Sequence, residues 1–200
     1  MWANKPPRPR LRETGVAAVE FALLALVFFT FIFGIIEVAR LMFVFGTLQE
    51  VTRKAAATAV HVYPSDAEGI ARLKRTAIFK SGSGELMLAS PVSDDSIRID
   101  YLALVRAPGN GALTLSPIDR TTLPATAAQH RQICMRNPNA ANCVRFVQVS
   151  ICRSQTASDC GAVQSQLMLP LVGITVPFHK ATTIAVAESF GYVPGTAPQP

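Results

Sequence analysis

One uninterrupted apolar run near the N-terminus limits what this chain can fold into. Between Val16 and Ile36 the sequence has 21 residues, and all of them are apolar except Glu20, Thr30 and Gly34. A helix of this length rises about 31 Å, which is enough to cross the hydrocarbon core of a bilayer. We therefore expect a membrane-spanning helix. The carboxylate near its start needs an explanation, because charged side chains inside a membrane are costly.

A cleaved secretory signal peptide is the main alternative to a retained span. Its apolar region would contain about 7–15 residues and would end at a small-residue cleavage site. The run here is longer, and "EVARLMFVF" (residues 37–45) continues the helical pattern beyond it. The sequence therefore favours a helix that stays in the membrane.

The formal net charge of the 200-residue chain is +6, and half of it lies before the apolar run. Residues 1–15 hold four basic residues and one acidic residue, whereas the remainder holds 15 basic and 12 acidic residues. A nucleic-acid-binding protein gathers Lys and Arg on one folded face, and the balanced remainder has no such cluster. We expect no nucleic-acid partner, and we interpret residues 1–15 as a basic leader whose first 14 residues are disordered. Its charged residues are Lys5, Arg8, Arg10, Arg12 and Glu13.

The helix is expected to continue well past the span. Apolar and small residues recur at spacings of three and four up to Val62, which places them on one stripe of a helix. The stripe consists of Val38, Leu41, Phe45, Leu48, Thr52, Ala55, Ala59 and Val62. Opposite charges at Glu37–Arg40 and Glu50–Lys54 have the spacing at which side chains meet on a helix surface. We predict one helix over residues 16–63, spanning the membrane to about residue 36. It is either a simple anchor or a helix built to pack against others.

Four cysteines lie close together in the second half of the chain, at Cys134, Cys143, Cys152 and Cys160. No C-x-x-C pair occurs, so the usual structural-zinc and thioredoxin-like signatures are missing, and we expect no metal site. An even, clustered set indicates disulfides and an oxidising compartment. Of three pairings we favour Cys134–Cys143 and Cys152–Cys160, because each closes a short turn-rich loop. Free, buried thiols remain the alternative.

Residues 64–193 are expected to form an α+β body, followed by a disordered tail at 194–200. A capping box at Ser65 and Glu68 predicts a second helix from about Asp66, with Ile70, Leu73 and Ala77 on its inner face. Partly alternating segments at 97–105 and 144–152 predict strands. "GALTL" is expected to pair with the first of these through the "APGNG" turn, residues 182–192 to form a last strand, and "LVGITV" to be a loop or edge strand. The predicted fold is a long helix packed on a small antiparallel sheet.

No catalytic or cofactor-binding motif is recognised in the sequence. His61, His130 and His179 share no ligand spacing with one another or with acidic residues, and we interpret His130, four residues before Cys134, as a surface histidine. A phosphate-binding loop and a nucleophile-elbow motif are both missing. We therefore expect a protein that is not an enzyme, with no cofactor and no small-molecule substrate.

The start of the chain resembles the processing site of type IV pilin-like proteins. In "RLRETGVAAVEF" a basic tail is followed by Gly15, and Glu20 is the fifth residue after that glycine, at the head of the apolar helix. The wider stretch 15–60 resembles the TadE-like pseudopilins of the Flp/Tad pilus system. The matching features are "AAVEFAL", "GIIE-x-x-R" and "LQ-x-x-x-R-x-A-A", with a looser similarity at "VRFVQVSI" and "TTIAVAES".

This resemblance implies a fold, a processing step and a set of partners. A prepilin peptidase would cut between Gly15 and Val16, and Glu20 would compensate the new amine of Val16 on its own chain or on a neighbouring subunit. A buried charge is tolerated when it is paired in this way. The implied protein is a pilin-like minor subunit that acts by helix packing. Its partners would be inner-membrane lipid, the prepilin peptidase, and other pilins or Tad assembly proteins.

The expected location is the bacterial inner membrane, with a single pass. Basic residues on both sides of the span give only a slight positive-inside bias, so the cysteines decide the orientation. They favour a periplasmic body and a cytoplasmic leader. The main alternative is an uncleaved, membrane-anchored periplasmic binding or sensing module.

Overall fold

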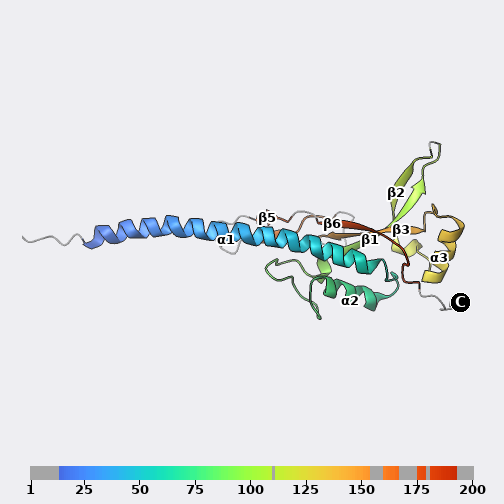
Figure 1. Ribbon diagram of the computed structural model, residues 1–200, viewed down its shortest axis with the longest axis horizontal. Coiled ribbons are helices and arrows are strands. Elements are labelled where there is room, and N and C mark those ends of the chain that lie inside the picture. Colours follow the sequence, from blue (N-terminus) through green and yellow to red (C-terminus); the bar gives the residue numbers. More distant parts are fainter. Residues whose placement is uncertain (1–13, 110, 154–159, 167–174, 179–180, 193–200) are drawn as a thin grey trace, which may run out of the picture. The chain divides into compact units, whose positions relative to one another are not determined.

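The computed structural model describes residues 14–109, 111–153, 160–166, 175–178 and 181–192. The chain divides into two compact units, residues 1–40 and 41–200. We call them the anchor and the body, and each is described by itself. The predicted leader up to residue 13 and the predicted tail at 194–200 lie outside the described residues. Figure 1 shows the elements, which make up an α+β protein with a long N-terminal helix, as predicted.

Helix α1 (Thr14–Ala59) provides the described part of the anchor and the first element of the body. No proline interrupts it, and the hydroxyl of Thr30 is satisfied within the helix by the Leu26 carbonyl at 2.7 Å. The predicted end at residue 63 is four residues too late. After Ala59 the backbone tightens, because the amides of His61 and Val62 donate to carbonyls only three residues back. This tighter turn ends the helix ahead of Pro64.

Within the body, α1 packs one face against the core. The predicted stripe is buried at Leu48, Thr52, Ala55 and Ala59, whereas Val38, which lies in the anchor, is exposed. The buried face is wider than the stripe, since it also includes Val44, Val51 and Ala56, and Val60 just after the helix is buried as well. The alanines allow the helix to approach closely, and the hydroxyl of Thr52 lies 2.9 Å from that of Thr183.

The main sheet has four antiparallel strands in the order β2-β1-β3-β6. They are β1 (Ile97–Arg106), β2 (Leu113–Ile118), β3 (Val144–Ile151) and β6 (Thr182–Val186). Alternate residues of β1 and β3 are buried in the core, with Tyr101 opposite Val147. The predicted pairing of "GALTL" with the first strand is confirmed, although the last strand is shorter than expected.

Helix α2 (Ala67–Ala77) buries the three predicted inner residues, Ile70, Leu73 and Ala77. The predicted capping box is wrong by one residue. Asp66 caps the helix, and its side chain accepts a hydrogen bond from the Gly69 amide at 2.8 Å. With this shift Glu68 stands too early to reach back to the cap, and it pairs with Arg72 at 2.9 Å instead.

A third helix and one short strand of the body were not predicted. Helix α3 (Ala127–Arg136) begins at Thr126, whose hydroxyl accepts from the Gln129 amide at 3.3 Å. Strands β4 (Gln164–Gln166) and β5 (Thr175–Pro177) form a separate two-stranded sheet. Of the predicted loop or edge strand "LVGITV", only Thr175 and Val176 are described, and both belong to β5. Short 3-10 turns lie at Asp94–Ser96 and Arg120–Thr122.

Candidate functional site

Gly15 and Val16 lie in the first turn of α1. A side chain added at Gly15 would meet nothing within 4 Å, and its backbone does not adopt the left-handed conformation that favours glycine. Glycine is also a poorer helix former than alanine by about 1 kcal/mol. Nothing in the described structure therefore requires a glycine at this position.

Glu20 lies one helical turn after Val16, at the i,i+4 spacing that places two side chains on the same helix face. Its side chain is exposed in the isolated chain, and no basic residue of the described segments forms an ion pair with it. Its neighbours along the helix are apolar. The structure thus leaves a carboxylate on an apolar helix without a positive partner among the described residues.

The apolar run of α1 is exposed in the isolated chain. Its large side chains between Val16 and Ile36 keep between 38% and 73% of their surface accessible. The best 18-residue window of the helix has a mean hydropathy of 2.6, and none of that window is buried. α1 is therefore one helix that is long and apolar enough to cross a membrane. Just after the run, Arg40 Nε donates to Glu37 at 2.9 Å, as the spacing predicted.

The second predicted ion pair of α1 forms with a different partner. Glu50 lies 4.0 Å from Arg53. The ammonium group of Lys54 lies over the ring of Phe79, 4.6 Å from its centroid. The cation is thus placed against an aromatic face that the sequence spacing could not reveal.

The four cysteines form two disulfides, Cys134–Cys143 and Cys152–Cys160, with Cα–Cα distances of 5.2 and 4.9 Å. These are the pairs favoured from loop length. Cys143 and Cys152 flank β3 directly, so each end of this central strand is tied to a neighbouring segment. By loop-closure reasoning each bridge contributes roughly 2.5–3 kcal/mol to the stability of the body.

His130 is buried beside the first disulfide, and its interpretation as a surface histidine is wrong. Only 5% of its surface is accessible, because α3, which the sequence did not reveal, turns this face towards the core. Its ring packs against Phe190, with centroids 4.8 Å apart, and near Tyr63 at 6.2 Å. Its Nε2 accepts a hydrogen bond from the Val144 amide at 2.9 Å. In a neutral ring the proton is therefore on Nδ1.

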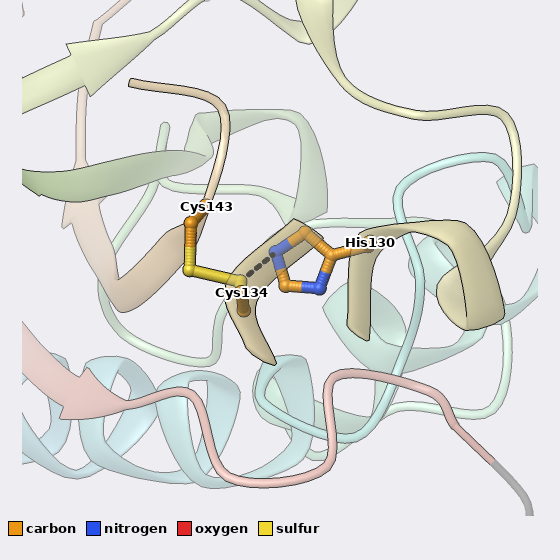
Figure 2. Close-up of side chains that lie close together, drawn as sticks. All are labelled: His130, Cys134 and Cys143. Atoms are coloured by element: carbon orange, nitrogen blue, oxygen red, sulfur yellow. Dashed lines mark hydrogen bonds between the residues drawn. A yellow bond between two sulfur atoms is a disulfide. The ribbon is translucent and has the colours of Figure 1, made fainter. Parts of the chain in front are cut away.

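Burial lowers the pKa of His130 to about 4, so the imidazole is neutral near pH 7. Figure 2 shows its ring directed at the Cys134 sulfur, with Nε2 and Sγ 3.4 Å apart. A disulfide sulfur has no proton to donate, and Nε2 is already an acceptor for Val144. We therefore interpret this approach as a packing contact.

The ligand atoms of His130, Cys134 and Cys143 lie within 4.8 Å of one another, as in a metal site. The two sulfurs are joined to each other, however, and metals bind thiolates. The histidine lone pair is also engaged by a backbone amide. The arrangement is best explained as structural: it joins α3 to the start of β3.

The other predicted histidines do not join this group. His61 follows α1, and its Nδ1 lies 3.0 Å from the Ser189 hydroxyl. No carboxylate of the described residues contacts His61 to orient it as a base. His179 lies outside the described residues.

Comparison with protein families gives a match to part of the chain. The family described as TadE-like protein matches residues 15–57, which begin at Gly15 and end two residues before the end of α1. No curated protein and no solved structure matches the chain. The resemblance expected from the sequence is confirmed over this segment, and it indicates a role related to Flp/Tad pili.

Proposed function

We propose that this chain is a pilin-like minor subunit of a Flp/Tad-type pilus system. It is inserted once in the bacterial inner membrane, with the leader in the cytoplasm and the body in the periplasm. A prepilin peptidase cuts it between Gly15 and Val16. It then acts by helix packing, with other pilins or Tad assembly proteins as partners, and not by catalysis.

The observation that carries this proposal is the coincidence of the family match with α1. Two local features support it. Gly15 is a glycine that the fold does not need, which points to a requirement from outside the folded chain. Glu20 stands one turn from Val16, so a new amine at Val16 would lie on the same helix face as the carboxylate.

Cleavage would also reduce the cost of an unpaired charge within the membrane. An unpaired carboxylate in the apolar helix costs up to about 3 kcal/mol near the bilayer centre, and less towards an end. An amine at Val16 supplies the missing positive charge, from the same chain or from a neighbour in a helix bundle. The two disulfides support a periplasmic body, because disulfides persist in oxidising compartments.

The processing step is tested with a pair of glycine variants. Gly15→Leu and Gly34→Leu each add a large side chain to an open position of the same helix. In cells with the prepilin peptidase, Gly15→Leu should accumulate as the longer form, and Gly34→Leu should be shortened like the parent protein. Equal shortening of both variants would show that Gly15 does not determine cleavage.

The assembly role is tested at Glu20. Glu20→Gln keeps the shape of the side chain and removes its charge, so it should be processed normally while isolation together with other pilus components falls. Glu68→Gln, at an exposed glutamate of α2 in the body, is the matched control. Normal piliation with Glu20→Gln would rule out the assembly role of this charge.

A further inference from the structure

A cluster of exposed apolar side chains lies on the body beside α1. It joins one exposed segment of α1 to the segment that follows α2, and we call it the apolar patch. Its members keep from 50% to 77% of their surface accessible: Met42, Phe43, Phe79, Met87 and Leu88. Several of them line a hollow of 660 Å³, together with Gly46 and Ile78. Exposed apolar clusters of this kind mark contact surfaces.

The backbone of the second segment supports a functional interpretation. Phe79 and Leu88 have φ values of 61° and 62°, in the left-handed region that bulky side chains rarely adopt. Both side chains are exposed, so packing into the core does not explain why a glycine or asparagine is not used. Such backbone conformations tend to occur at functional surfaces.

The exposed side of α1 changes from apolar to polar within the body. Met42 and Phe43 are exposed and apolar, whereas the next exposed side chains are Gln49, Glu50 and Arg53. A membrane helix changes in this way where it leaves the bilayer. The hollow lies at this change, since it is lined by Met42 and Phe43 at one end and by Glu50 at the other.

We propose that the apolar patch lies in the headgroup region of the bilayer, and that the segment from Phe79 to Leu88 is a second point of membrane contact. This inference rests on the proposed membrane insertion of α1. From Val16 to Phe43 the helix has 28 residues and rises about 42 Å. A bilayer including its headgroups is about 40–45 Å thick. Met42 and Phe43 therefore reach the headgroup region, and Phe79 and Met87 line the same hollow as they do.

Two basic side chains beside the patch suit a lipid surface. Lys54 lies over the Phe79 ring, and Lys80 lines the hollow. Long basic side chains can place their stems along apolar groups and their ammonium groups among lipid phosphates. Glu50 also lines the hollow, and it faces Arg53 at 4.0 Å. A lipid surface is favoured over a second copy of the chain because Met42 and Phe43 lie only about two helical turns beyond the apolar run that ends at Ile36.

Tryptophan fluorescence of the full chain in vesicles tests this placement. Trp2 is the sole tryptophan of the sequence and is replaced by Phe in every variant. A single tryptophan is then introduced by Met87→Trp in the patch, Leu115→Trp on β2, or Phe28→Trp in the span. Leu115 is the matched control, because it is an apolar residue of the body that is 48% exposed. The vesicles contain phosphatidylglycerol and phosphatidylcholine brominated at carbons 6 and 7 or at carbons 11 and 12.

We expect Met87→Trp to be quenched by bromines at carbons 6 and 7, and less by the deeper bromines. Leu115→Trp should be unaffected by either lipid. An unquenched, red-shifted Met87→Trp would overturn the inference, because the patch would then face water. A blue-shifted but unquenched emission that changes with protein dilution would overturn it in favour of a second copy. Phe28→Trp separates the two proposals: if it is also unquenched, the membrane insertion of α1 fails, and if it alone is quenched, only the patch fails.

Discussion

The two parts of helix α1 are both apolar, and yet they are built for different surroundings. In the anchor, large apolar side chains such as Phe21 and Phe31 occur on every side of the helix and are exposed in the isolated chain. In the body, the helix has one buried face, with Ala55 and Ala59 fully covered, and beyond Phe43 its other face is polar. A helix that is apolar on every side needs lipid or other helices around it. A helix with one apolar face can instead bury that face against its own sheet. The arrangement of apolar residues around the helix, more than their number, therefore determines whether each part is surrounded by lipid and other helices or by its own sheet.

The family match covers both parts of α1 and stops there. The rest of the body has its own sheet and two disulfides, and no curated protein or solved structure matches it. The proposed assembly function therefore rests on helix α1 and not on the body.

The difference between the two parts of α1 is tested most strongly by placing the same charge in each part. Val51→Asp puts a carboxylate where the side chain is 0% exposed, and it should lower the free energy of unfolding of the body by about 4 kcal/mol or more. Gln49→Asp, on the exposed face, should change it little. Urea titration of the full chain in detergent, followed by circular dichroism, measures both.

Val27→Asp introduces the same carboxylate in the anchor. It should leave the urea midpoint of the body unchanged and reduce the fraction of the protein that resists extraction from membranes by alkaline carbonate. If Val27→Asp also unfolded the body, the two parts of the helix would not be independent.

The buried histidine should make the stability of the body depend on pH. Burial lowers the pKa of His130 from 6.5 to about 4, so the unfolded chain binds more protons between these values. The stabilisation is complete above pH 6.5 and is lost as the pH falls towards 4, by up to about 3 kcal/mol. His130→Gln should flatten this part of the stability profile, and the exposed His61→Gln should leave it intact. An unchanged profile in His130→Gln would refute the assignment.

Removing one disulfide should have a somewhat smaller effect. Cys134→Ser with Cys143→Ser should lower the free energy of unfolding of the body by about 2.5–3 kcal/mol, because the unfolded chain regains the freedom of the closed loop. The membrane-inserted fraction should not change. The same midpoint with and without reductant in the parent protein would show that the bridge does not stabilise the body.

The smallest expected effect concerns the polar contact of α1 with the sheet. Thr52→Val removes the hydroxyl that faces Thr183 and should cost about 1 kcal/mol. Thr58 has an exposed hydroxyl that bonds only within the helix, and Thr58→Val should cost less than about 0.5 kcal/mol. Equal costs would show that the contact with Thr183 contributes nothing.

The sequence predicted the elements whose patterns are local. The apolar run, the spacing of three and four in α1, and the alternation in β1 and β3 each report which face of an element is buried. The short loops around the cysteines predicted their pairing for the same reason. These features depend on neighbours along the chain.

The features that were missed depend on residues far apart. Helix α3 is short and mostly polar, so its pattern is weak, and the burial of His130 follows from its packing against Phe190, 60 residues away. The apolar patch combines Met42 with Met87, which no periodicity relates. The H-x-x-x-C spacing of His130 and Cys134 was visible in the sequence, but it could not reveal which side of an unrecognised helix these residues share.

The central claim is that the start of α1 is a cleavage and packing signal, and the N-terminal residue of the protein tests it most directly. The protein is isolated from membranes of cells that make the prepilin peptidase, and its first residues are read by Edman degradation and intact mass. We predict a chain that begins at Val16, with Glu20 as its fifth residue. A chain that still begins at Met1 or Trp2 would contradict the claim and favour an uncleaved, membrane-anchored module.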